Sequence, residues 1–327
     1  MSDFTLTKDA EGIATITWDC VGRPMNVMSQ QGFEDLDAMI DDVLADDAVK
    51  GAIITSAKAD FAAGMDLNVI AKTKEMNIDN PAQGCFDMVM KIHEILRKIE
   101  LGGMDFKTKK GGKPIACVVP GTALGIGLEL PLSCHRIFAA DNPKAKIGLP
   151  EIKVGIFPGA GGTTRLVRMM GAMAASPFLL EGKLVDPKKA KAAGIVQEVS
   201  EDPMADARAW VLSAKESDLV KPWDAKGYKM PGGAPYHPAG FMTYVGASAM
   251  VHSNTFGVYP AAKALLSAAY EGAMVPFDTA LKIECRHFVS VLVNPSSSNM
   301  IRSLFINKGA LEKGAVRPEG VEDQRVK

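Results

Sequence analysis

Strand-like and helix-like patterns alternate along the first two hundred residues of this 327-residue chain. The strand-like runs are short and apolar, or alternate in polarity, and cover residues 12–18, 51–55, 115–119 and 136–140. The helical segments predicted between and after them cover residues 33–44, 86–99, 125–134 and 163–170. Strands that alternate with helices pair in parallel, so the pattern predicts an α/β domain that ends near Val199.

The chain changes character after this domain. Helical patterns cover residues 204–217, 261–271 and 277–293, with no comparable run of strands. A loop rich in proline and glycine, MPGGAPYHPAG at residues 230–240, separates the first of these helices from the others. We therefore predict an α/β domain over residues 1–203, a helical extension over 204–308 and a charged tail over 309–327.

Composition and charge exclude several classes of function. The formal net charge is −1, so no overall field draws the chain to nucleic acid or to an anionic membrane. The N-terminus lacks the pattern of a signal peptide, and no apolar run is long enough for a transmembrane segment. The five cysteines show neither CxxC nor metal-ligand spacing, which is typical of a reducing compartment. We expect a soluble cytoplasmic enzyme.

Two glutamates lie in glycine-rich, mostly apolar sequence between residues 113 and 171. Glu129 ends the run ALGIGLE, and Glu151 follows Leu149 and Pro150. A glutamate is almost never fully buried without a partner or a function. The glycines of the first run lead into a helix, whose first N–H groups have no partner within the helix and favour negative charge. The pattern predicts acid–base chemistry beside a site that stabilises an oxyanion.

A second glycine-containing run, FAAGMDL at residues 61–67, also follows a predicted buried strand. Its small residues let the backbone approach a ligand closely, so it is a candidate for a second N–H donor. For either run alone, ordinary close packing is the favoured explanation. For the glutamates, the alternative is a pair of structural ion pairs with nearby Arg136, Lys153 or Arg165.

Other catalytic motifs fit poorly. Two Gly-x-Gly patterns, at Gly125 and Gly159, lack the third glycine of the dinucleotide-binding fingerprint. The chain also lacks a Gly-x4-Gly-Lys-Ser/Thr phosphate loop. Its five histidines are scattered, and none lies beside a serine or cysteine in a nucleophile motif, which argues against a hydrolytic triad.

Four motifs, taken in order, resemble the crotonase superfamily and specifically its enoyl-CoA hydratases. They are FAAGMDL, ALGIGLEL, LPEIKVGIFPGAGGTTRL and GKLVDPKKAKAAGIV. The runs RPMNVMS, KPWDAKGYKMPGG and YPAAKALLSAAYEG are similar to the N-terminal part of multifunctional fatty-acid β-oxidation α-subunits. The resemblance implies a crotonase-like ββα spiral core followed by a helical C-terminal extension.

The resemblance also implies roles for matching residues. Glu129 and Glu151 correspond to the family's catalytic carboxylates, and the N–H groups of Met65 and Ile126 correspond to its oxyanion hole. Glu129 would orient and deprotonate water, and Glu151 would give a proton to C2 of the enoyl thioester. Coenzyme A would enter as part of the substrate, so neither a separate cofactor nor a metal is expected.

Further residues are predicted to bind the acyl-CoA substrate. They are Arg23, Lys58, Gly64, Asp66, Lys72, Gly125, Gly127, Pro158 and Gly159. The chain departs from the family at Met65, where a small alanine is usual, and at Ile126, where glycine is usual. Asn68 replaces a frequent lysine near the CoA adenine. The two larger side chains are expected to narrow the site.

Several alternatives stay open at this point. A pure Δ3-Δ2-enoyl-CoA isomerase would need only one carboxylate, and a non-catalytic acyl-CoA-binding or assembly fragment would need neither. The sequence ends about where the α-subunits' NAD-binding dehydrogenase domain would begin, so dehydrogenase activity is not expected. The resemblance leaves two assemblies open, which are a homo-oligomer and, in the full-length context, a complex with a thiolase subunit.

Overall fold

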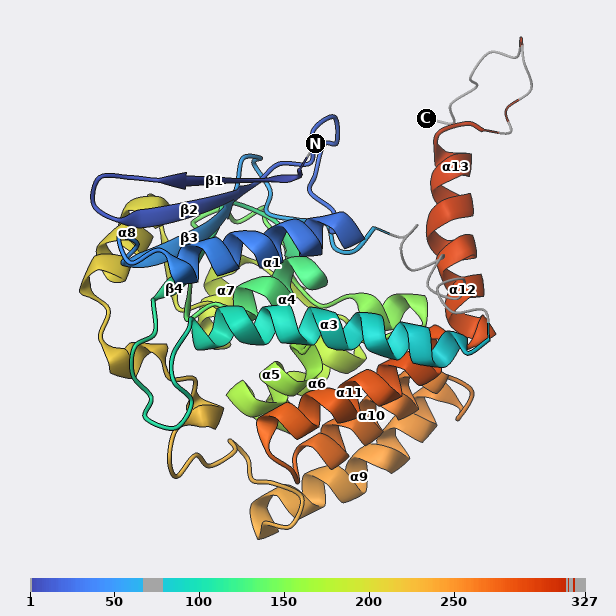
Figure 1. Ribbon diagram of the computed structural model, residues 1–327. Helices are drawn as coiled ribbons and strands as arrows, with labels where there is room; N and C mark the ends of the chain where they lie inside the picture. Colours follow the sequence, from blue (N-terminus) through green and yellow to red (C-terminus); the bar gives the residue numbers. More distant parts are fainter. Residues whose placement is uncertain (1, 67–78, 316, 318–319, 321–327) are drawn as a thin grey trace.

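The computed structural model describes residues 2–66, 79–315, 317 and 320, and Figure 1 shows their arrangement. Within these residues, a six-stranded sheet has the order β1-β2-β3-β4-β6-β9. Its strands are β1 (Phe4–Lys8), β2 (Ile13–Trp18), β3 (Gly51–Ser56), β4 (Ile115–Val119), β6 (Arg136–Ala140) and β9 (Glu198–Ser200). Pairing is parallel from β2 to β9, as the alternation predicts, whereas β1 pairs antiparallel with β2.

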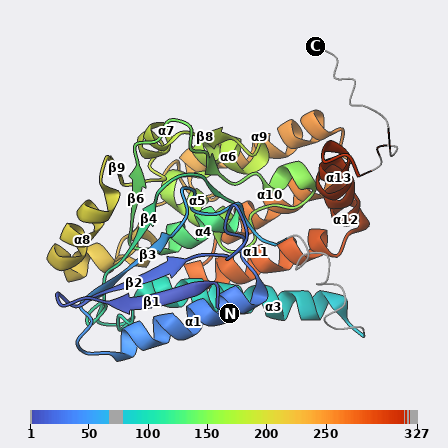
Figure 2. The ribbon, with the colours of Figure 1, turned by 90° about the horizontal axis from the view of Figure 1, so that it is seen from above.

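The two faces of this sheet have different coverings, because successive side chains of a strand point to opposite faces. Ile16, Ile54 and Cys117 belong to the main core, which also holds apolar residues of α1 (Gln30–Ala45), α3 (Pro81–Leu101) and α4 (Ile126–Ser133). Ile53 and Val118 point the other way and pack beneath α8 (Pro203–Ser213). Figure 2 shows α1 and α8 on opposite sides of the strands.

Sequence signals set the ends of these helices. The Ser29 hydroxyl accepts from the N–H of Gly32 at 2.9 Å and caps α1. Asn80 caps α3, Pro81 occupies its first turn, and Gly102 ends it with φ 55°. A capping residue followed by proline also begins α8, where Asp202 accepts from the N–H of Ala205 at 3.0 Å.

A small second sheet brings the glycine-rich runs together. It contains β5 (Ala123–Leu124), β7 (Ile147–Gly148) and β8 (Leu184–Val185), with β7 between the other two. An isolated bridge joins Ala62 to Ala123, and the N–H of Leu124 donates to the Ala62 carbonyl at 3.1 Å. Residues 61–66 of the run FAAGMDL and the start of the run ALGIGLEL therefore lie side by side, after the carboxyl ends of β3 and β4.

Short elements connect this layer to the rest of the fold. They are η2 (Glu151–Val154), α5 (Gly162–Met170), α6 (Ala172–Leu180), α7 (Pro187–Ala192), η3 (Glu216–Leu219) and η4 (Pro222–Asp224). The buried guanidinium of Arg165 on α5 bonds Glu100 of α3 at 2.9 Å. This ion pair fixes α5 against α3.

The helical extension covers the side of the molecule next to α3 and α5. It contains α9 (Pro238–Thr255), α10 (Pro260–Gly272) and α11 (Phe277–Leu292), followed by α12 (Pro295–Ile301), the π-helical turn η5 (Arg302–Asn307) and α13 (Lys308–Glu312). Figure 1 shows α9, α10 and α11 stacked below α3, while α13 extends away from the rest of the molecule. The helix α12 contacts α11 and η2. The helix α9 was not predicted, because the loop signals before it were not followed by an amphipathic pattern.

The boundary drawn at residue 203 remains a prediction. The helix that follows it, α8, packs on β3, β4 and β6 rather than on the extension. All five cysteines are buried, and none of them forms a disulfide. No helix in the described part of the chain is long and apolar enough to cross a membrane.

Candidate active site

Gly125 marks the junction between β5 and α4 and determines where Glu129 lies. Its φ and ψ are 57° and −128°, a backbone conformation that favours glycine. The chain turns there into α4, so Ile126 is the first helical residue and its N–H has no partner within the helix. Glu129 follows one turn later and is 3% exposed.

Two backbone N–H groups hold the carboxylate of Glu129. The N–H groups of Ala160 and Gly162 both donate to its Oε1 at 2.8 Å. The other oxygen, Oε2, takes no part in these bonds. Burial raises the pKa of Glu129 to about 7, while the two N–H donors and Arg165 act in the opposite direction.

Glu151 is the first residue of the turn η2, and its Oε1 lies close to Gly125. A Cβ added to Gly125 would be 3.0 Å from this oxygen. The other oxygen, Oε2, is buried and has no hydrogen-bond partner among the described residues. Burial, with the negative charge of Glu129, raises the pKa of Glu151 well above its usual value. This oxygen is therefore open to a bond from water or from a ligand in the site.

Two backbone N–H groups flank these carboxyl groups. The N–H of Met28 donates to Gly64 O, and Met28 O accepts from the N–H of Asp66, both at 2.9 Å. In a parallel bridge of this kind the N–H of the residue between, Met65, points away from the partner strand. The Gly64 and Gly125 backbones approach each other closely, since a Cβ on Gly125 would be 3.7 Å from Gly64 Cα. The N–H groups of Met65 and Ile126 are thus candidates for a shared anion site.

These groups border one apolar cavity of about 340 Å³. Glu129, Glu151, Met65 and Ile126 all line it. So do three of the predicted substrate residues, Gly64, Gly125 and Gly159, and apolar residues of the extension, Phe288, Leu292, Ile301 and Phe305. The cavity combines an acid–base pair and N–H donors with an apolar wall, which suits a thioester that carries an acyl chain.

The other predicted substrate residues that the structure describes do not line this cavity. Arg23 is half exposed and bonds Asp66 at 2.9 Å, next to Met65. Lys58 bonds Asp19 at 2.6 Å. Gly127 packs on Ala62, since a Cβ there would be 2.7 Å from the Ala62 Cβ.

Pro158 also lies outside the cavity lining, and two other predicted positions are not described by the structure. The Pro158 carbonyl accepts from the Thr163 hydroxyl at 2.8 Å. Lys72 and Asn68 lie outside the described residues. The alternative of structural ion pairs is not supported, because in the described chain Arg165 pairs with Glu100 and Arg136 lies 3.8 Å from Glu198.

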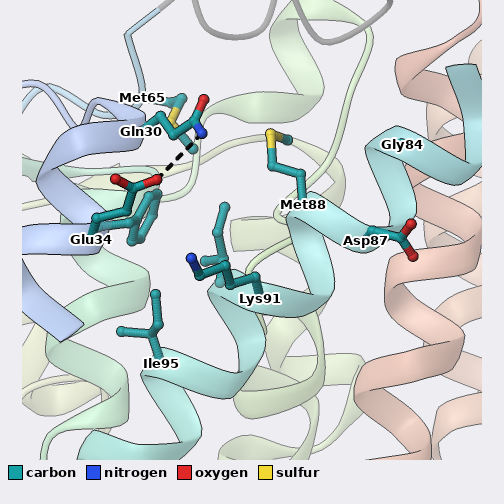
Figure 3. A pocket seen from close by; sticks show the side chains of 10 residues that line it. Gln30, Glu34, Met65, Gly84, Asp87, Met88, Lys91 and Ile95 are labelled. Atoms are coloured by element: carbon teal, nitrogen blue, oxygen red, sulfur yellow. Dashed lines mark hydrogen bonds between the residues drawn. The ribbon is translucent and has the colours of Figure 1, made fainter. Parts of the chain in front are cut away.

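A second cavity of about 320 Å³ adjoins the first between α1 and α3. Figure 3 shows Gln30 and Glu34 of α1 across from Met88 and Lys91 of α3, with Met65 beside Gln30. Both cavities are lined by Met65, Met88 and Ile92. Methionine side chains are unbranched and adapt easily to the shape of a ligand. The side chains of Met65 and Met88 can therefore change the boundary between the two cavities.

Besides the apolar residues of the extension that line the cavity, sequence reasoning missed two polar residues of the extension that bond segments next to it. Glu284 on α11 is fully buried and accepts from the N–H groups of Gly161 at 2.6 Å and Thr164 at 2.7 Å. Tyr259 precedes α10; its hydroxyl accepts from the N–H of Gly155 at 3.0 Å and donates to the Ile152 carbonyl. Glu284 falls on the apolar stripe of its helix, three or four residues from Leu281 and Phe288, and that position was an available signal.

Comparisons with known proteins agree with this geometry. The sequence pattern of the enoyl-CoA hydratase/isomerase family matches residues 8–216. The chain belongs to the enoyl-CoA hydratase/isomerase family. The match spans strands β2 to β9 of the large sheet, both carboxylates and both candidate N–H donors. The fold of the chain is the crotonase-like spiral with a helical extension.

Individual relatives support the same assignment. The chain is 29% identical over 314 residues to the fatty acid oxidation complex subunit alpha of Shewanella amazonensis, covering 95% of this chain and 42% of that protein. It is also 29% identical to the Shewanella frigidimarina protein of that name, covering 99% and 43%. The chain therefore spans less than half the length of these relatives.

Solved structures share the fold at lower identity. An enoyl-CoA hydratase/isomerase from Mycobacterium paratuberculosis superposes with a TM-score of 0.61 at 17% identity, covering 92% of this chain and 98% of that one. The OdaA structure from Pseudomonas aeruginosa gives 0.57 at 20% identity, covering 93% and 99%. At these identities the likeness shows the fold alone.

Proposed function

We propose that this chain is an enoyl-CoA hydratase that adds water across the 2-trans double bond of an enoyl-CoA thioester in fatty-acid β-oxidation. One observation carries the proposal: Glu129 and Glu151 line the same apolar cavity, beside the N–H groups of Met65 and Ile126. The names of the Shewanella relatives point to fatty-acid oxidation.

The proposed reaction assigns one task to each group. The thioester oxygen accepts hydrogen bonds from Met65 and Ile126, which stabilise the enolate that forms as water attacks C3. Each such donor contributes ~10²–10³-fold to the rate. Glu129 takes a proton from the attacking water, and Glu151 gives its proton to C2. Each acid–base group contributes ~10²–10⁴-fold.

The order of the two pKa values fits these tasks. Glu129, with a pKa of about 7, has two N–H donors on its carboxylate and ionises near neutral pH. Burial, with the negative charge of Glu129, raises the pKa of Glu151 well above its usual value and keeps it protonated. Neighbouring carboxyl groups in different environments can act as base and acid at one pH.

We further propose that the acyl chain occupies the apolar cavity and that the side chains of Met65 and Met88 move aside for longer acyl chains. The adjoining cavity between α1 and α3 provides the extra space. Arg23 and Lys58 remain the proposed contacts for the CoA phosphates, with Lys72. No metal is proposed, and in the described residues no group of three or more His, Cys, Asp or Glu side chains is arranged to hold one.

Three further parts of the proposal concern the protein in its cell. We expect no NAD-dependent oxidation of the hydrated product, because the glycine patterns at Gly125 and Gly159 belong to the carboxylate site. We expect a cytoplasmic location, with which the buried cysteines, none of them in a disulfide, agree. Assembly as a homo-oligomer, or with a thiolase subunit in the full-length context, remains a prediction that mass measurement in solution tests.

The first experiment mixes the protein with crotonyl-CoA and, separately, with trans-3-hexenoyl-CoA. A hydratase removes the absorbance of the conjugated crotonyl thioester and yields 3-hydroxybutyryl-CoA. An isomerase without hydratase activity converts the 3-enoyl substrate to a conjugated 2-enoyl product and leaves crotonyl-CoA unchanged. Failure to turn over either substrate while binding both would support a non-catalytic acyl-CoA-binding protein.

A further inference from the structure

One loop lies between two buried carboxylates. Along residues 160–164, the N–H groups of Ala160 and Gly162 donate to Glu129, whereas those of Gly161 and Thr164 donate to Glu284. All four distances lie between 2.6 and 2.8 Å. Glu129 comes from α4 and Glu284 from α11, so the loop is held from the core and from the extension at once.

The backbone of the loop is shaped for this alternation. Gly161 has φ 96° and ψ 0°, in the left-handed region, which turns its own N–H toward Glu284 while those of its neighbours point to Glu129. The position admits no side chain, because an added Cβ would lie 1.9 Å from the buried Nη1 of Arg165. The two sets of N–H groups are therefore geometrically linked.

We propose that Glu284 is a positioning residue for hydration, which holds the loop so that its N–H groups fix Glu129 for attack by water. This inference rests on the proposed hydratase function. Glu284 acts through the loop and is not assigned contact with substrate. Glu151 belongs to the separate turn η2, and neither of its carboxyl oxygens bonds this loop in the hydrogen bonds of the described residues.

Burying a carboxyl group against a helix costs more free energy than burying an apolar side chain. Transfer of an ionised group from water into a protein interior is strongly unfavourable unless hydrogen bonds compensate it. Burial, followed by the negative charge of Glu129, raises the pKa of Glu284 to about 8, so its carboxyl group is largely protonated near neutral pH. Arg165 pairs with Glu100, and His93 of α3 is held neutral by burial. An apolar side chain would avoid the cost of burying a polar group, so the two hydrogen bonds from the loop, one to each oxygen, explain the acidic side chain best.

The test separates the work of Glu129 from that of Glu151. Hydration needs both, but exchange of the C2 hydrogen of butyryl-CoA in D₂O needs only Glu151 and the oxyanion site. The exchange starts from the ionised form of Glu151: the C2–H bond breaks, the proton goes to the Glu151 carboxylate and the electron pair moves to the thioester oxygen. A deuteron from the exchanged carboxyl group then returns to C2, so the substrate changes only in isotope.

The variant Glu284→Gln keeps the side-chain shape but replaces one of the two acceptor oxygens by an amide NH₂ group, which cannot accept. Because a small misplacement of a reacting group costs up to ~10²-fold, we expect its hydration kcat to fall about 10- to 100-fold. KM for crotonyl-CoA and the rate of C2 exchange should stay within about threefold of the parent values, since neither depends on how Glu129 is held. Glu284→Asp, which keeps both acceptor oxygens but is shorter by one methylene, should show the same split.

Glu271→Gln is the matched control, because Glu271 lies on the neighbouring helix α10 and pairs with Arg286 and His287, away from the loop. It should leave both rates unchanged. Parent-like hydration in Glu284→Gln would overturn the inference and leave the hydratase proposal intact. An equal fall of hydration and exchange in both Glu284 variants would also overturn it, since Glu284 would then serve only the fold. A parent that exchanges C2 without hydrating crotonyl-CoA would overturn the hydratase function and this inference together.

Discussion

The hydroxyl of Tyr259 accepts a hydrogen bond from the backbone N–H of Gly155 at 3.0 Å, across 104 residues of sequence. It also donates to the Ile152 carbonyl, so one hydroxyl joins two positions of the turn that begins with Glu151. Glu284 bonds the loop that holds Glu129 in a similar way. The helical extension thus contacts the supports of both carboxyl groups.

Replacing Tyr259 by Phe should impair Glu151 rather than Glu129. The change removes both hydrogen bonds, leaves the ring in place and should lower the free energy of unfolding by about 1–2 kcal/mol. Crotonyl-CoA hydration and C2 exchange of butyryl-CoA should both fall, by about tenfold, because both use Glu151. Tyr270→Phe, on the partly exposed face of α10, is the control. Unchanged C2 exchange in Tyr259→Phe would contradict the assignment.

The pH dependence of kcat/KM should report the two carboxyl groups as a coupled pair. Glu129 must be ionised to act as a base, and burial raises its pKa to about 7. Below that pH, kcat/KM for crotonyl-CoA should fall about tenfold per unit. Initial rates between pH 5 and 9 test this expectation. A flat profile from pH 5 to 7 would show that no base with this pKa takes part.

Glu284 should make the protein less stable as the pH rises. Burial, followed by the charge of Glu129, raises the pKa of Glu284 from 4.5 to about 8. Between these values the folded protein keeps a proton that the unfolded chain has released, so this contribution to stability is fully present below pH 4.5 and lost by pH 8. Urea unfolding at pH 5 and pH 8 should therefore show a larger loss of stability in the parent than in Glu284→Gln. Equal losses would contradict the pKa shift.

A side chain at Gly125 should damage the site. Alanine would be strained at φ 57° and ψ −128°, at a cost of about 1–3 kcal/mol, and its Cβ would lie 3.0 Å from Glu151 Oε1. Gly125→Ala should therefore be less stable and lose most hydration activity. Gly246 lies exposed in α9, where an added Cβ meets nothing within 4 Å. Gly246→Ala should be as active as the parent and more stable by up to about 1 kcal/mol. Comparable activity in both variants would show that the turn at Gly125 is not needed.

The local parts of the site were predictable from sequence. Glu129 and Glu151 occur in apolar, glycine-rich runs, where an acidic residue is rarely buried without a function or a partner. The structure places both at one cavity. The parallel sheet followed from alternating strands and helices. Short elements such as β5, β7 and β8 were missed, because two-residue strands have no periodicity to detect.

Contacts between distant segments were not predictable in the same way. Glu284 reads as one acidic residue within an amphipathic helix, and Tyr259 reads as a residue before a helix that begins with proline. Their importance depends on how α10 and α11 pack against α5 and η2, which local pattern does not determine. Lys58 illustrates the converse, because its sequence suggests a free cation and the structure pairs it with Asp19.

In the proposed function, Glu129 and Glu151 act together to hydrate an enoyl thioester. The most direct test follows the absorbance of crotonyl-CoA with the parent, Glu129→Gln and Glu151→Gln at equal, verified folded concentrations. We predict turnover by the parent and a fall of ~10²–10⁴-fold in kcat for each variant. Parent-like turnover in either variant, or none in a folded parent that isomerises trans-3-hexenoyl-CoA, would contradict it.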